Sequence, residues 1–341
     1  MQNFTVWPGG RRGWVFPLLA LLTFIFSWVG AYPSALVERW YSRAAFPLLS
    51  HYAGRFADLV AFAWLDPIIV VAVVALIALI WKRRWIWLIN AVAVVYLIFF
   101  WLWGLNYHRQ QLRSKLQVET ARTDSQAIDQ FARHAAAEIN RLYQTKQQEP
   151  YDEARIRAEA AERVRRVVSV IDGSNWEAAH RIKISRIADP WMHAAGIDGV
   201  FNPLAHEPVI SNTLLDIEKP FVISHELAHV RGYPDEGDAN VIAVLATLMS
   251  DDKSFQYSGW LSLWLYVRTR ELENLLDTGP RADLRRIFEK ARLEQVAWIN
   301  GFQRSLLDWF LKANNVEQGV RSYSRVVVIA SGTEPYWEHF R

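Results

Sequence analysis

Three apolar runs near the start of the chain constrain its fold more than any other feature. They cover residues 14–31, 61–81 and 85–105, carry almost no charge, and are rich in Leu, Ile, Val, Phe and Trp. A helix needs about 20 apolar residues to cross a bilayer, and each run comes close to that length. The sequence therefore predicts three transmembrane helices. The basic turn Lys82–Arg84 would join the second and third as a helical hairpin.

The composition agrees with a membrane location. The 341 residues include 17 Trp, a residue type that concentrates where a membrane meets water. A net charge of +3 is too small to indicate a nucleic-acid partner. The chain has no cysteine, which excludes disulfide bonds, thiolate metal sites and cysteine nucleophiles.

Basic residues beside the apolar runs indicate an orientation. Arg11, Arg12 and the Lys82–Arg84 turn lie close to the ends of the runs and favour the cytoplasmic side. Three spans then place residues 106–341 outside the cytoplasm. Residues 32–60 mix aromatic and basic side chains, which is typical either of an amphipathic helix on the membrane surface or of an ordinary loop with a buried helix.

From residue 106 onward the composition becomes that of a globular domain. Apolar residues at three-to-four spacing predict helices over 124–147, 152–171, 260–276 and 281–312. Short β-rich runs predict a small sheet from 181–187, 200–202 and 209–212. The expected fold is mainly α, with three membrane helices in an anchor over residues 1–105. An α+β domain with a small sheet would follow over residues 106–341.

The stretch from Phe221 to Asn240, FVISHELAHVRGYPDEGDAN, carries the chemistry. His225 and His229 are four residues apart, so on a helix both imidazoles face the same side and can share one metal ion. A catalytic zinc ion takes three protein ligands and a water molecule. Glu226 follows the first histidine and can act as the general base that takes a proton from the water.

Two neighbouring carboxylates compete for the role of third metal ligand. Asp235 falls in the spacing HExxHxxGxxD, which brings a ligand round a glycine turn in one class of HExxH peptidases. Glu236 begins an ExxAN run, which is similar to the ligand helix of gluzincin-type peptidases. Asn240 then lies on the same helix face and can hydrogen-bond a ligand histidine. Asp235 also suits the N-cap of the second helix, and we favour Glu236 as the ligand.

Several other side chains are candidates for binding a substrate. His206 and Glu207 precede the predicted strand 209–212, and an edge strand beside the metal helix commonly binds extended peptide. Tyr257 and Tyr323 could stabilise an oxyanion. The simpler alternatives are an ordinary loop and two packed tyrosines.

Several segments of the chain resemble a bacterial membrane-anchored family catalogued as domain of unknown function 3810 and regarded as zinc-peptidase-like. The resemblance rests on YSRAAFPLLS, WGLNYHR, NPLAHEPVISN, PFVISHELAHVRG with EGDAN, and FLKANNVEQGVRSYSRV. It implies a zincin-like fold with Zn²⁺ as the cofactor, and it supports Glu236 as the third ligand. The family's P-F-T-G-E-like run is PLAHE here, which keeps Glu207 but changes its neighbours.

We therefore expect a zinc metallopeptidase anchored in the bacterial inner membrane by several spans. Its domain would hydrolyse peptide bonds of a peptide or protein substrate outside the cytoplasm by zinc-activated water, with Glu226 as general base. The alternative is a non-catalytic envelope module, regulatory or scaffolding, that zinc staples together. An intramembrane protease is disfavoured, because Glu218, Lys219 and Arg231 bracket the motif with charge.

Overall fold

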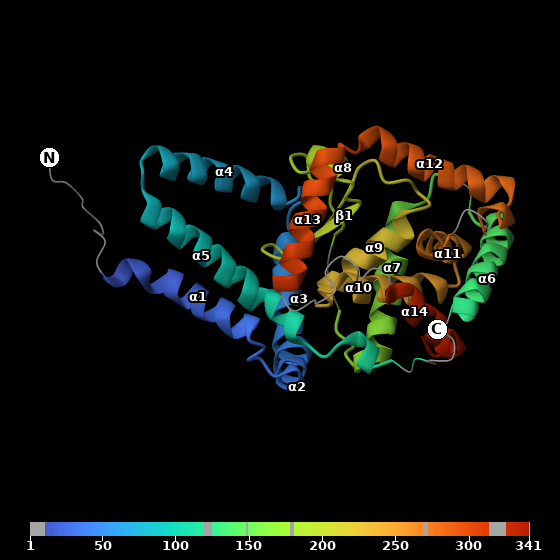
Figure 1. Cartoon of the computed structure of the whole chain (residues 1–341), viewed down its shortest axis with the longest axis horizontal. Coiled ribbons are helices and arrows are strands. Elements are labelled where there is room, and N and C mark those ends of the chain that lie inside the picture. Colours follow the sequence, from blue (N-terminus) through green and yellow to red (C-terminus); the bar gives the residue numbers. More distant parts are fainter. Residues whose placement is uncertain are drawn as a thin grey trace.

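The computed structural model describes residues 11–116, 118, 125–147, 149–177, 181–268, 272–313 and 325–340. An elongated arm of apolar helices projects from a helical domain (Figure 1). The arm consists of α1 (Val15–Trp28), α4 (Leu65–Trp81) and α5 (Trp85–Leu102). At its base lie α2 (Ser34–Leu36), the π-helical η2 (Val37–Ala45) and α3 (Phe46–Ala57).

The domain is almost entirely helical, which confirms the mainly α prediction. Its helices are α6 (Ser125–Tyr143), α7 (Glu153–Asp172), α8 (Asp189–Ala195), α9 (Lys219–Val230), α10 (Glu236–Leu248), α11 (Lys253–Val267), α12 (Thr278–Glu294), α13 (Ala297–Ala313) and α14 (Arg325–Thr333). Short 3-10 helices lie at Gly104–His108, Leu112–Ser114, Leu272–Leu275 and Glu334–Phe340. Two strands, β1 (Gly199–Asn202) and β2 (Glu207–Ile210), complete it.

The prediction of three spans is supported for one helix. Among the described residues, α5 alone is long and apolar enough to cross a membrane, at 18 residues. Helix α1 has 14 residues, because it follows a 3-10 turn and ends before Gly30, whose φ is +66°. Helix α4 has 17 residues, because its first turn holds Asp66 and it stops at the basic turn.

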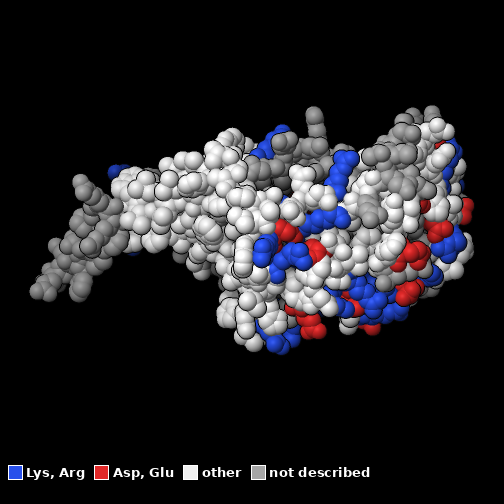
Figure 2. Space-filling model, turned by 90° about the horizontal axis from the view of Figure 1, so that it is seen from below, with Lys and Arg blue, Asp and Glu red and all other residues white. Residues whose placement is uncertain are grey.

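The arm exposes apolar side chains along its length. No residue of α4 is buried, and Val71, Ile77 and Val92 are more than two-fifths exposed. On the face that Figure 2 shows, the arm carries no charge except Lys and Arg near its free end, whereas charges of both signs gather on the domain. An exposed apolar surface of this extent is typical of a site that contacts another protein or a membrane.

Two carboxylates attach α4 to the domain. Glu207 accepts hydrogen bonds from the backbone N–H of Trp64 at 3.0 Å and of Leu65 at 2.7 Å. Asp66 accepts from the N–H of Arg186 at 3.0 Å and of Ile187 at 3.1 Å. Since the first N–H groups of a helix have no partner within the helix, Glu207 satisfies donors that would otherwise be buried without one.

Helix α10 lies at the centre of the domain core. Its residues from Ala239 to Leu248 are buried without exception. It packs against α7, α9, α11 and α14, and α9 packs in turn against both strands. The small side chains of Ala239 and Ala243 suit the close packing of α10 among its neighbouring helices. The two helices that carry the motif are therefore held by the core rather than by loops.

The small sheet has two strands, not three. Strands β1 and β2 pair antiparallel, with Val200 opposite Val209. The predicted run 181–187 contributes only an isolated bridge at Lys183, which pairs with Val209 on the other side of β2. The strand predicted at 209–212 lies at residues 207–210 instead, because the chain leaves the strand and enters a turn after Ile210.

Candidate metal centre

A helix, a glycine turn and a second helix bring the motif residues together. Pro220 lies in the first turn of α9, where its missing N–H removes no hydrogen bond. The helix ends at Val230 with Arg231 as its C-cap, and Gly232 follows with φ +76°, a conformation that favours glycine. The side chain of Asp235 then caps α10 by accepting from the N–H of Asp238 at 3.0 Å.

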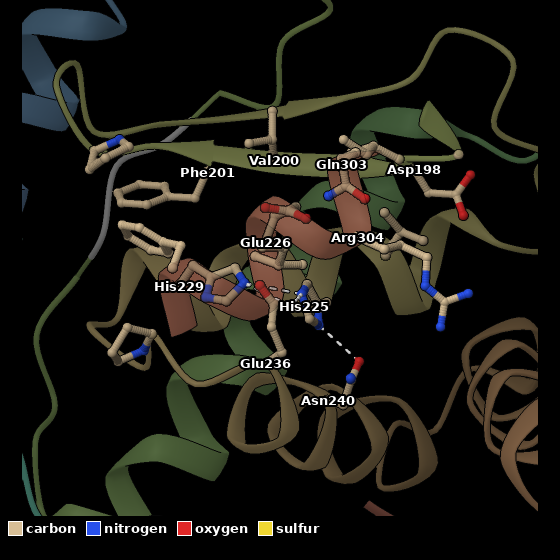
Figure 3. Close-up of a pocket in the computed structure, with 18 of the residues that line it drawn as sticks. Asp198, Val200, Phe201, His225, Glu226, His229, Glu236, Asn240, Gln303 and Arg304 are labelled. Carbon is tan, nitrogen blue, oxygen red and sulfur yellow. Dashed lines mark hydrogen bonds and ion pairs between the residues drawn. The ribbon is translucent and has the colours of Figure 1, made fainter. Parts of the chain in front are cut away.

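The side chains of His225, His229 and Glu236 converge (Figure 3). One donor atom from each lies within 4.8 Å of the others. The Nε2 atoms of the two histidines are 3.1 Å apart, and Glu236 Oε2 lies 3.2 Å from Nε2 of His225 and 3.7 Å from Nε2 of His229. This is the two-nitrogen, one-carboxylate set that catalytic zinc sites use.

The hydrogen bonds behind the histidines determine which ring nitrogens face the centre. His229 Nδ1 lies 2.8 Å from the backbone oxygen of Tyr233, which can only accept, so Nδ1 carries the proton. His225 Nδ1 lies 2.9 Å from Oδ1 of Asn240 in the same way. In neutral rings both Nε2 atoms then present lone pairs toward Glu236. Such an arrangement is stable only around a cation or an added proton, so the donors fit a metal ion.

The electrostatics of the cluster agree with this reading. Burial would raise the pKa of Glu236, but His229 and His225 outweigh it and hold that pKa well below its ordinary value. Burial lowers the pKa of His229, and the charge of Glu236 reverses this and raises it to about 9. The three groups therefore favour a shared positive charge at their centre.

Of the two predicted carboxylates, Glu236 is the one that the structure places beside the histidines. Asp235 serves as the N-cap of α10, the structural role that the sequence also allowed. Asn240 lies one turn further along α10 and contacts His225, as the ExxAN spacing predicts.

Glu226 points away from the other three side chains toward strand β1 (Figure 3). Its side chain is buried, and its Oε2 has no hydrogen-bond partner among the described residues. Burial raises the pKa of Glu226 to about 7, against the opposing charges of His225 and His229. A buried carboxyl without a partner is costly, and such groups occur where a reaction needs a proton acceptor.

Gly199 leaves the space that Glu226 occupies. A Cβ atom at Gly199 would come within 2.9 Å of Cδ of Glu226. We expect Gly199→Ala to destabilise the protein by about 1–3 kcal/mol, because the carboxyl group must move in a packed interior. Thermal unfolding of the full chain measures the effect.

A matched control is Gly301→Ala, since a Cβ there meets nothing within 4 Å. It should be neutral or stabilising by up to about 1 kcal/mol. In a Glu226→Ala background the penalty of Gly199→Ala should disappear, because the clashing atoms are gone. An equal penalty in both backgrounds would contradict this packing.

A cavity of about 700 Å³ opens over the cluster. The histidines and Glu236 form its floor, β1 forms one wall, and α13 forms another through Gln303 and Arg304 (Figure 3). Aromatic residues Phe99, Trp103 and Tyr107, from the end of α5 and the turn after it, line the side nearest the arm. The cavity is large enough for several residues of a polypeptide.

Strand β1 offers free backbone groups to this cavity. Ser211 N donates to the carbonyl of Asp198 at 2.9 Å, and hydrogen-bonded pairs alternate along an antiparallel ladder. The N–H and C=O groups of Gly199 and Phe201 therefore point away from β2. Strand β2 is paired on both sides, because Lys183 N donates to the carbonyl of Pro208 at 3.0 Å. The edge strand beside the cluster is therefore β1, and the edge position suggested for residues 209–212 is occupied by the pairing with Lys183.

Three predicted substrate-binding residues lie away from the cavity. His206 is buried between the rings of Phe46 and Phe201. Glu207 is buried against Lys183 at 3.1 Å and holds α4, so its role is structural. The hydroxyl group of Tyr257 donates to Asp283 at 2.8 Å in the core. Tyr323 lies outside the described residues.

A buried ion-pair cluster behind the site was missed from the sequence. Arg109 donates to Glu38 at 2.9 Å, to Asp172 at 3.0 Å and to the carbonyl of Gly232 at 2.9 Å. Its guanidinium also lies over the ring of Tyr233, 3.9 Å from the centroid. In the sequence, Arg109 lies four residues after the apolar run 85–105, where a basic residue is usually read as a charge that flanks a membrane span. The arginine instead holds the turn whose carbonyl fixes His229.

Comparisons with known proteins extend this description to a family. No curated protein and no solved structure matches the chain. A family model described as "Protein of unknown function (DUF3810)" matches residues 41–330. That range includes α4, α5, both strands and the helices of the candidate metal centre. The chain therefore belongs to the DUF3810 family.

Proposed function

We propose that the protein is a zinc-dependent peptidase that is anchored in a membrane. The single observation that carries the proposal is the convergence of His225, His229 and Glu236, with donor atoms within 4.8 Å of one another, beneath a cavity that also contains Glu226. Zinc in such a site supplies a Lewis acid that lowers the pKa of water and polarises a carbonyl group.

The remaining roles belong to side chains of the chain itself. Asn240 and the carbonyl of Tyr233 orient the two histidines, so that both Nε2 atoms would be available to hold the ion. Glu226 accepts the proton of the attacking water and delivers it to the leaving amine. Burial raises its pKa toward neutrality, which favours a group that takes up and then releases a proton. A site that only stapled the fold together would not need a buried, unpaired carboxyl beside its ligands.

The free edge of β1 supports a polypeptide as substrate. An extended peptide can add to this edge by pairing with the N–H and C=O groups of Gly199 and Phe201. The peptide then crosses the cavity above the cluster, with its backbone held close to Glu226. Main-chain recognition of this kind allows peptides of varied sequence to bind, and the side chains that line the cavity walls would then determine selectivity.

The membrane arrangement is part of the proposal. The exposed apolar surfaces of α1, α4 and α5 support three spans, with flanking residues completing the two shorter ones. The basic turn at residues 82–84 favours the cytoplasmic side. The domain would then work outside the cytoplasm of a bacterial cell, in its inner membrane.

Peptide cleavage by the full chain in detergent tests the proposal. A mixture of unstructured peptides is incubated with the purified protein, and new termini are identified by mass spectrometry. We expect cleavage that a zinc chelator stops and added zinc restores. Absence of cleavage by a folded, zinc-loaded chain would contradict the proposal.

A further inference from the structure

Helix α13 has an exposed apolar face. Apolar side chains recur along it at a spacing of three to four residues, which places them on one side of the helix. Their exposed fractions are 73% for Trp298, 64% for Phe302, 51% for Leu306 and 64% for Trp309. No acidic residue interrupts this face. A row of exposed aromatic residues on a helix marks a surface that meets a partner.

The opposite face of α13 closes the cavity over the metal cluster. Asn300, Gln303, Leu307 and Phe310 project from it and line the cavity. One helix therefore separates the candidate active site from whatever covers the apolar face. Any partner of that face lies a single helix away from the metal cluster.

Both ends of α13 are fixed where the arm enters the domain. At one end, the ring of Phe310 lies 5.9 Å from that of Phe99 at the domain end of α5. At the other end, Asn300 donates to the carbonyl of Ala195 on α8 at 2.7 Å. Met192 of α8 belongs to a small apolar cluster against which Leu65, at the start of α4, also packs. Figure 1 shows α13 running crosswise to the arm between the domain ends of α4 and α5.

Exposed apolar side chains also surround the start of α4. Ile187 and Trp191 are exposed beside it, as are Phe56, Leu59 and Phe62 in the segment that leads into it. Trp concentrates at membrane interfaces, and Trp, Phe and Leu form the apolar face of helices that lie there. A bilayer that surrounds the arm would meet α13 along its length, as it meets interfacial amphipathic helices.

We propose that α13 lies in the interfacial layer of the bilayer and forms the membrane-facing wall of the cavity. The occupant of its apolar face is lipid. Resting on the proposed peptidase function, the substrates are polypeptides held at the membrane surface. They would reach the edge of β1 from the side that faces the bilayer.

Spin labels test the position of α13, and the absence of native cysteine allows one label per chain. Phe302→Cys and Ser305→Cys place labels on the outer face, and Ser305 is already small and exposed. Arg133→Cys on α6 is the control, since its side chain is 57% exposed and α6 lies at the end of the domain opposite the arm (Figure 1). Each full-length variant is reconstituted into liposomes of phosphatidylcholine and phosphatidylglycerol.

The measurement is the collision rate of each label with molecular oxygen, which dissolves in lipid, and with a water-soluble nickel complex. We expect the labels at positions 302 and 305 to collide more often with oxygen than the label at position 133 does. The label at position 133 should collide more often with the nickel complex than the other two do. Equal nickel accessibility at all three positions would overturn the proposal. So would spin–spin broadening at position 302 that disappears on dilution with unlabelled chain, because a second copy would then cover the face.

The substrate class has a separate readout. Cells that produce the wild-type chain or the Glu226→Gln variant are compared for new protein N-termini. Cleavage sites close to predicted membrane segments of other proteins would support the inference, and sites confined to soluble proteins would overturn it. If no site depends on Glu226, the proposed peptidase function fails, while the label accessibilities still decide where α13 lies.

Discussion

The Glu226→Gln variant should lose peptide cleavage by a factor of roughly 10²–10⁴ while keeping its zinc. Glutamine has the shape of glutamate but cannot accept a proton, and position 226 lies outside the three-residue donor cluster. The site that remains can still bind zinc and substrate. Cleavage rates at saturating peptide, measured beside the zinc content of the same sample, check both parts of the expectation.

Glu289→Gln is the matched control, because Glu289 is exposed on α12 and far in sequence from the motif. It should cleave at the wild-type rate. A Glu226→Gln variant that is as active as the control would rule out Glu226 as the general base. If neither variant nor wild type cleaves any peptide, but all bind zinc, the result would favour the alternative, a non-catalytic scaffold whose fold zinc stabilises.

The Arg109→Met variant should be less stable than wild type by about 3–5 kcal/mol. The substitution keeps an unbranched apolar stem but leaves the carboxylates of Glu38 and Asp172 buried beside fewer positive charges. It also removes the hydrogen bond to Gly232, so the turn after His229 is loosened. Guanidinium unfolding of the full chain in detergent measures the difference.

Arg133→Met separates this effect from the loss of any arginine. Arg133 pairs with Asp129 one helical turn away, and both side chains are about half exposed. Such exposed pairs contribute at most about 1 kcal/mol. If the Arg109 and Arg133 variants unfold at the same denaturant concentration, the buried cluster does not stabilise the fold as we describe.

Local spacing predicted the parts of the site that depend on neighbouring residues. The four-residue interval between His225 and His229, and between Glu236 and Asn240, places each pair on one helix face. The glycine turn after Arg231 and the N-cap at Asp235 also follow from residue type. Spacing alone did not decide between Asp235 and Glu236 as the third metal ligand, because both spacings occur in HExxH peptidases. In the structure, Asp235 caps helix α10 instead.

Features that depend on distant residues could not be predicted in this way. Strand β2 is not an edge, because Lys183 pairs with it from an earlier segment. Glu207 is a helix cap for a segment more than a hundred residues earlier in the chain. Arg109 is buried in ion pairs with Glu38 and Asp172, which lie on two other helices. Its sequence context alone, beside an apolar run, resembles that of any charge that flanks a membrane span.

The zinc content of the purified full chain tests the central claim most directly. Elemental analysis should find about one zinc ion per wild-type chain and per Asp235→Ala chain, and far less in His225→Ala, His229→Ala and Glu236→Ala. His134→Ala is the control, because His134 is half exposed on α6, and it should keep its zinc. A folded wild-type chain without metal, or cluster variants that retain the wild-type amount, would contradict the account.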